Sequence, residues 1–141
     1  MEWSDLVGKK VNQVRINPDR DILELSVEGG EVIYLSAVGD CCSESWFEHI
    51  EGAECLIGKE IRRVVDREMP KDYDDGDFNV TRFYGWTIET DSGRCDLEMR
   101  NLSNGYYGGD VEIASDPLDQ YRDKQPAENY QDMKVIAGVT A

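Results

Sequence analysis

Positive charge and long apolar runs are what this sequence has least of. Its 141 residues include 15 lysines and arginines against 30 aspartates and glutamates, so the formal net charge at pH 7 is -15. Such a charge repels nucleic acid and anionic lipid, and we expect no direct binding to DNA, RNA or a membrane. No stretch approaches the roughly 20 apolar residues that span a bilayer. The acidic N-terminal segment MEWSD also lacks the basic and apolar regions of a signal peptide.

Cysteine and histidine are scarce as well, with four cysteines and a single histidine, His49. Without a secretion signal we expect reduced thiols in a cytosol. Adjacent Cys41 and Cys42 cannot form an unstrained disulfide with each other. Zinc knuckles separate their paired cysteines by about two to four residues, a spacing that is absent, so we expect no metal site.

Familiar catalytic motifs are missing too. There is no phosphate-binding loop, nucleophile elbow or dinucleotide fingerprint. A thiol just before a helix is activated by the helix dipole, which favours Cys42 as a nucleophile, but the neighbouring Asp40 and Glu44 oppose it. We therefore predict a non-enzyme with no catalytic residue and no cofactor, and keep a cysteine-dependent enzyme using Cys41 or Cys42 as an alternative.

Alternating apolar and polar residues predict a mainly β fold. A short turn leads into a strand that continues through Ile16, a turn follows at residues 17–21, and strands are expected at 22–27 and 31–38 around a Gly29-Gly30 hairpin turn. The predicted register pairs Val27 with Val32, Leu25 with Tyr34 and Leu23 with Ser36. A second hairpin is predicted at 86–99, with Trp86 opposite Met99, Ile88 opposite Leu97 and Thr90 opposite Cys95.

The stretch 39–52 separates these hairpins and is expected to contain a short helix that begins at Ser45. Ser45 followed three residues later by Glu48 is a capping box, Trp46, Phe47 and Ile50 supply an apolar side, and Gly52 ends the segment.

Two parts of the chain resemble each other. Residues 56–64 match residues 6–14 in every apolar position, the glycine and the first lysine, and a hairpin follows each segment. We predict a single β-rich domain at 1–114 with an internal repeat at 6–52 and 56–113, followed by a polar C-terminal tail at 115–141. The two three-strand units are expected to form a sheet, a sandwich or a partly open barrel with one or two short helices.

Candidate binding residues lie where the copies differ. An acidic loop at 66–77 precedes the second hairpin and lacks the closing glutamate of an EF-hand, so a solvated charge run is favoured over calcium binding. A loop with paired tyrosines follows the hairpin, and tyrosine supplies contact area at low entropic cost. The candidate binding residues are Asp72, Asp74, Asp75, Asp77, Trp46, Tyr106 and Tyr107.

The sequence from Leu6 to Ile113 also resembles a small family of unknown function found largely in bacteriophages and prophages. The most specific part of the match is Gly39-Asp40-Cys41-Cys42-Ser43, followed by Trp46 and by Glu48-His49-Ile50. The resemblance implies a viral origin and a bacterial cytoplasm, and assigns no functional residue.

These expectations combine into three functional hypotheses. The first is a non-enzymatic phage inhibitor that binds a basic host defence protein through its acidic surface, in the host cytoplasm and with a possible homo-oligomeric state. The second is a sponge for a cyclic-nucleotide immune signal, with Trp46 or the tyrosine pair for stacking and Arg62, Arg63 or Arg100 for phosphate. The third is the cysteine-dependent enzyme.

Overall fold

The computed structural model describes residues 1–40, 42–105, 108–115 and 130–132. These residues form strands and two short 3-10 turns, written η. In chain order the elements are η1 (Trp3–Leu6), β1 (Lys10–Ile16), β2 (Ile22–Val27), β3 (Val32–Gly39), β4 (Glu44–Glu51), η2 (Ala53–Cys55), β5 (Lys59–Glu60), β6 (Arg63–Asp66), β7 (Tyr73–Asp74), β8 (Val80–Thr90), β9 (Gly93–Ser103), β10 (Gly109–Ala114) and β11 (Gln131–Asp132).

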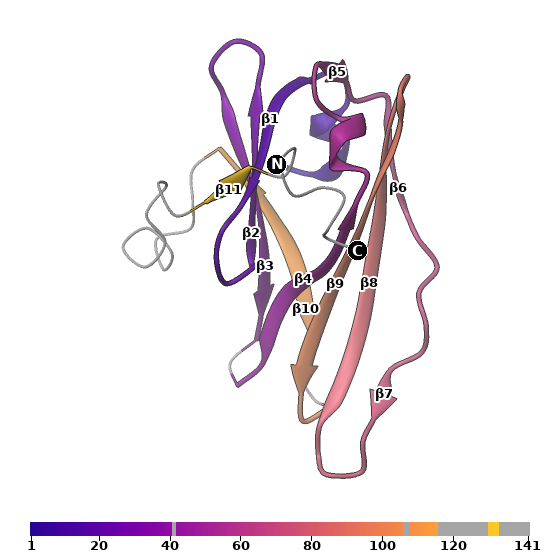
Figure 1. Ribbon diagram of the computed structural model, residues 1–141. Coiled ribbons are helices and arrows are strands. Elements are labelled where there is room, and N and C mark those ends of the chain that lie inside the picture. The colour runs from indigo at the N-terminus through magenta and orange to yellow at the C-terminus, as the bar shows by residue number, and fades with distance from the viewer. Residues whose placement is uncertain (41, 106–107, 116–129, 133–141) are drawn as a thin grey trace.

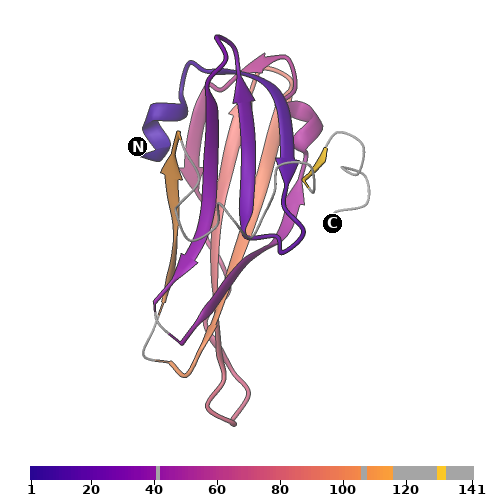
Figure 2. The ribbon, with the colours of Figure 1, turned by 90° about the vertical axis from the view of Figure 1, so that its left-hand side faces the viewer.

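Two antiparallel sheets pack face to face as a sandwich that is not closed into a barrel (Figures 1 and 2). One sheet has the order β10-β3-β2-β1-β11, and β5 also pairs with β1. The other has the order β4-β9-β8-β6, and β7 also pairs with β8. The mainly β prediction is confirmed, and of its three alternatives the sandwich is correct. No helix in the described part of the chain has the length and apolar character needed to cross a membrane.

The core lies between the two sheets and follows from the alternation of side chains along each strand. In β9, Cys95, Leu97 and Met99 are fully buried, while Asp96 and Glu98 between them are only half-buried. Side chains alternate in the same way on β4 and on the strands of the opposite sheet. Their inward-facing apolar side chains form one cluster with those of β9. Burial of these apolar groups is the main force that holds the sheets together.

Each half of the chain gives the strand after its last hairpin to the other sheet. Strands β1, β2 and β3 lie in one sheet, but β4 pairs with β9; strands β6, β8 and β9 lie in the second, but β10 pairs with β3. The segments before β1 and β6 also bond to each other symmetrically: the Gly8 N–H donates to the Ile61 carbonyl at 2.8 Å and the Gly58 N–H to the Val11 carbonyl at 2.7 Å. This arrangement is the one expected of two copies of one unit, although the repeat itself stays a prediction.

The helix expected at 45–52 is wrong, because this segment is the strand β4. A β-bulge between Phe47 and His49 adds one residue to the strand. Phe47 and Ile50 are therefore both buried although they are three positions apart, and a spacing of three imitates the apolar side of a helix. Ser45 caps no helix; its hydroxyl donates to the Val38 carbonyl at 2.9 Å.

The registers of both hairpins also differ from the prediction. In the first, Leu25 pairs with Ile33 and Leu23 with Leu35, one residue away from the expected partners. This pairing places aliphatic residues opposite each other on the core face. In the second, Ile88 pairs with Cys95 and Trp86 with Leu97, a shift of two residues that leaves the same side chains facing the core.

Of the tail at 115–141, the structure describes Ser115 and residues 130–132. The strand β11 pairs with Ile16 and Arg15 of β1. The Arg15 guanidinium lies 5.3 Å from the centre of the Tyr130 ring and bonds through two nitrogens to the buried carboxylate of Glu24, with an Nε–Oε1 distance of 2.5 Å. Tyr130 therefore contacts the body of the domain through the guanidinium of a partly buried ion pair.

Candidate functional site

A hairpin formed by β7 and the start of β8 projects from the end of the sandwich opposite η1 (Figures 1 and 2). Tyr73 pairs with Thr81 and Asp74 with Val80. The loop between them closes through a hydrogen bond from the Asp75 N–H to the Asn79 carbonyl at 3.1 Å. Residues 73–79 are all exposed, and we name residues 73–80 the hairpin tip.

Three of the predicted acidic residues lie together in the hairpin tip. The Asp74 carboxylate accepts the Gly76 N–H at 2.8 Å, and the Asp75 carboxylate accepts the Asp77 N–H at 2.9 Å. These short-range bonds set the shape of the loop and leave further oxygen lone pairs directed at solvent. The tip is therefore a shaped acidic surface.

Asp72 has a different role. Its carboxylate lies 3.1 Å from Nε of Arg82, and Arg82 also donates to the Gly105 carbonyl at 2.8 Å. This ion pair joins the base of the hairpin to the loop that follows β9. Asp72 is thus beside the hairpin tip but already has a cationic partner.

Aromatic side chains on the hairpin tip are the functional feature that sequence reasoning missed. Phe78 is 85% exposed and Tyr73 62% exposed. Phe78 has a φ of 62°, a left-handed conformation that bulky residues rarely adopt. The sequence did contain one sign of this feature, a single phenylalanine inside a loop otherwise made of aspartate, glycine and asparagine.

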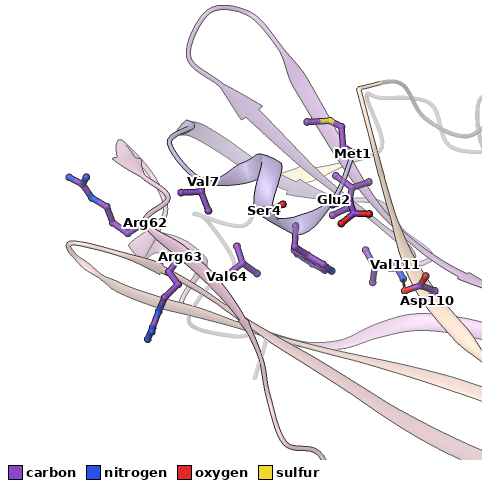
Figure 3. A pocket seen from close by; sticks show the side chains of 11 residues that line it. Met1, Glu2, Ser4, Val7, Arg62, Arg63, Val64, Asp110 and Val111 are labelled. Atoms are coloured by element: carbon purple, nitrogen blue, oxygen red, sulfur yellow. Dashed lines mark hydrogen bonds between the residues drawn. The ribbon is translucent and has the colours of Figure 1, made fainter.

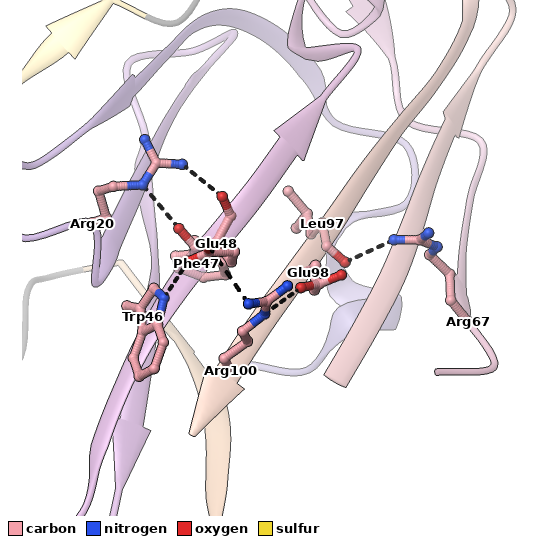
Figure 4. Close-up of polar contacts among 8 residues, drawn as sticks. All are labelled: Arg20, Trp46, Phe47, Glu48, Arg67, Leu97, Glu98 and Arg100. Atoms are coloured by element: carbon pink, nitrogen blue, oxygen red, sulfur yellow. Dashed lines mark hydrogen bonds and ion pairs between the residues drawn. The ribbon is translucent and has the colours of Figure 1, made fainter. Parts of the chain in front are cut away.

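Trp46 lies away from the hairpin tip, on the outer face of β4 (Figure 4). Its indole Nε1 donates to Glu48 at 2.6 Å, and Glu48 lies 3.6 Å from Arg100, which also bonds to Glu98 at 2.6 Å. Trp46 and Arg100 therefore belong to one chain of polar contacts across this sheet. Tyr106 and Tyr107 lie outside the described residues, as does Cys41.

The thiols and the histidine lie at separate places in the described part of the chain. Cys42 precedes β4, while His49 lies five residues into that strand, roughly 17 Å along it. Cys95 is buried in the core, and burial raises the pKa of its thiol. No three histidine, cysteine, aspartate or glutamate residues are grouped to hold a metal ion among the residues that the structure describes.

A cavity of about 530 Å³ opens at the side of the sandwich between η1, β6 and β10 (Figure 3), and we name it the lateral cavity. Arg62 and Arg63, two of the arginines considered for phosphate binding, line it together with Trp3 rather than Trp46. Arg62 is bonded to Asp91 at 2.9 Å and Arg63 to Glu89 at 2.8 Å. Both guanidinium groups thus already have carboxylate partners.

Comparison with known proteins gives a family but no activity. An uncharacterized protein of Acanthamoeba polyphaga mimivirus is 31% identical over an alignment of 115 residues, which covers 76% of this chain and 88% of that protein. No solved structure matches the chain. A family model described as a domain of unknown function, DUF7448, matches residues 4–113. The chain therefore belongs to the DUF7448 family of domains of unknown function.

Proposed function

We propose that this protein is a non-enzymatic inhibitor of viral origin that binds a basic protein of its host through the hairpin tip. The observation that carries the proposal is Phe78, which is 85% exposed and has a left-handed backbone between three aspartates and an asparagine. The left-handed backbone costs about 1 kcal/mol of folding free energy, and the exposed ring contributes almost no burial in return. Residues held exposed in a costly conformation are typical of sites that contact a partner.

The chemistry of the hairpin tip indicates the class of partner. Proteins that bind single-stranded nucleic acid combine a positively charged groove with surfaces on which bases stack. The carboxylates of Asp74, Asp75 and Asp77 offer negative charge in place of phosphates, and the ring of Phe78 offers a flat apolar face in place of a base. We therefore propose that the tip competes with nucleic acid for a basic cleft of a host defence protein in the host cytoplasm. The virus-encoded relative is consistent with this setting.

The test uses the full chain as bait in a pull-down from host lysate, beside two variants. Phe78→Ala removes the exposed ring, and the triple variant Asp74→Asn, Asp75→Asn and Asp77→Asn removes the charge while keeping an oxygen that can accept the loop hydrogen bonds. The matched control carries Glu28→Gln, Glu54→Gln and Glu112→Gln, three exposed positions elsewhere with the same change in charge.

The wild type and the control should retain a basic, nucleic-acid-binding protein, and both hairpin variants should lose it. Binding should weaken between about 0.05 and 0.5 M salt, because exposed charges are screened over a shorter distance as ionic strength rises. Added single-stranded nucleic acid should release the partner. Retention of the same partner by both hairpin variants, or binding that does not respond to salt, would contradict the proposal.

The lateral cavity keeps a nucleotide sponge as the second candidate, since its volume is in the range of small-molecule sites. The carboxylate partners of Arg62 and Arg63 oppose phosphate binding, so the hairpin tip is favoured. A thermal shift with a panel of cyclic nucleotides separates the two candidates, because a tight ligand raises the melting temperature. Loss of function in folded Cys42→Ser protein would support the enzyme hypothesis instead.

A further inference from the structure

The lateral cavity has both polar and apolar walls, and two of its apolar side chains are about half exposed. Val64 of β6 and Val111 and Ile113 of β10 line it. Val7 and Met1, at its mouth, are 47% and 46% exposed. With Tyr73 and Phe78 of the hairpin tip, these are the large apolar side chains that the described structure leaves exposed. The cavity is thus a second surface with exposed apolar side chains (Figure 3), beside η1, which lies at the end of the sandwich opposite the hairpin (Figure 1).

Trp3 gives the cavity a rigid aromatic wall. Its ring stacks on Trp86, with centroids 5.0 Å apart and an angle of 27° between the planes. Trp86 is buried in the core, so the stack holds the Trp3 indole in place. A fixed indole is the side chain that attracts cations most strongly through its ring face.

The charges around the cavity favour a cation. Arg62 bonds to Glu60 at 2.8 Å and to Asp91 at 2.9 Å, and the side chains of Arg62 and Arg63 point away from the other lining residues in Figure 3. Among the described residues no ion pair involves Glu2 or Asp110, which line the other side. The Met1 α-amino group, which also lines the cavity, is one cation outside these ion pairs, so the two carboxylates leave a negative balance among the described residues.

An added β-strand is not the occupant that the edge of β10 favours. The Gly109 N–H donates to the Tyr84 hydroxyl at 3.1 Å, and the Val111 N–H donates to the Asp110 carboxylate at 2.8 Å. These bonds occupy the donors that a new strand would need at this position, a common way to protect a sheet edge. What the cavity offers to a partner is room for side chains.

We propose that the lateral cavity is a docking site for a segment of a basic protein, separate from the hairpin tip. The segment inserts an aliphatic side chain beside Trp3 and places a neighbouring lysine or arginine against Glu2 and Asp110. A protein segment suits the site better than a small molecule, because the exposed Val7 and Met1 surround a wide mouth that a protein surface would cover.

The test titrates isotope-labelled full chain with three blocked tripeptides, Lys-Leu-Lys, Lys-Gly-Lys and Glu-Leu-Glu, and follows backbone and indole NMR signals. Two variants probe the site. Asp110→Asn removes the charge but keeps an oxygen that can accept the Val111 N–H, and Val7→Gln changes a half-exposed side chain at the mouth. Glu54→Gln is the matched control, since it removes one exposed carboxylate that does not line the cavity.

Lys-Leu-Lys should shift the signals of the Trp3 indole and of Val7 and Val111, Lys-Gly-Lys should shift them less, and Glu-Leu-Glu should leave them unmoved. Asp110→Asn should raise the Kd for Lys-Leu-Lys about threefold, the effect of one surface ion pair. Val7→Gln should weaken binding as well, and Glu54→Gln should not. The proposal is overturned by equal shifts with Glu-Leu-Glu, by shifts confined to residues 73–80, or by unchanged affinity in either cavity variant.

Discussion

Trp3 stacks on Trp86 and so attaches the N-terminal turn to the core of the sandwich, with 5.0 Å between ring centroids. Trp86 faces inward from β8, and η1 packs against β6 beside it. We predict that Trp3→Ala lowers the free energy of unfolding by about 2 kcal/mol, because it removes a partly buried ring and an aromatic pair. Urea denaturation measures this, with Trp3→Phe as the control that keeps a ring. An unchanged midpoint for Trp3→Ala would show that η1 is not part of the folded unit.

Gly52 and Gly58 offer a matched pair of substitutions. Both have positive φ, 86° and 75°, but a Cβ on Gly52 would lie 2.2 Å from the Arg94 carbonyl oxygen, whereas one on Gly58 would meet nothing within 4 Å. Gly58→Ala should lower the free energy of unfolding by about 1 kcal/mol, because alanine is disfavoured in a left-handed backbone conformation. Gly52→Ala should cost about 2 kcal/mol more, because the backbone of β9 must move. Equal unfolding midpoints for the two variants would contradict the close contact between Gly52 and β9.

The exposed and the buried cysteine should react with an alkylating reagent at different rates. Cys42 is exposed, whereas Cys95 is buried and burial raises the pKa of its thiol, so little thiolate forms there. In a timed alkylation of the folded protein, Cys42→Ser should remove one thiol from the fast phase, and Cys95→Ala should leave that phase unchanged. All remaining thiols should react quickly in denaturant. A fast phase that shrinks in Cys95→Ala would place Cys95 at the surface.

Tyr130 should make stability fall at alkaline pH. Burial raises the pKa of its phenol to about 12, and the nearby carboxylate of Glu24 adds to the shift. Between the unfolded value of about 10 and this folded value, the unfolded chain loses the proton first, so the folded state binds more protons and the free energy of unfolding decreases as pH rises. Below pH 10 the Tyr130 phenol keeps its proton in both states and does not change the free energy of unfolding. Chemical denaturation at pH 9, 10 and 11 should show a smaller decrease for Tyr130→Phe than for the wild type. Identical decreases would mean that Tyr130 is solvated.

Much of the fold could be predicted from local pattern. The turn at 17–21 and the strand at 22–27 were expected within these bounds, because a proline with flanking Asx residues and strict alternation are local signals. The acidic loop was also apparent from composition, and three of its aspartates lie together in the hairpin tip. The exposure of Phe78 was not apparent, since burial depends on whether another part of the chain reaches the side chain.

The sequence by itself determined the net charge, the β character and the positions of most turns, because composition and two-residue alternation depend on neighbouring residues only. Tertiary structure alone decided that Glu44–Glu51 is a strand, since pairing with β9 and a bulge outweigh a local helix signal. It also decided the hairpin registers, the exchange of β4 and β10 between the sheets, and the lateral cavity. Each of these depends on contacts between residues far apart in the chain. The free energy of such contacts cannot be predicted from the residues of one segment.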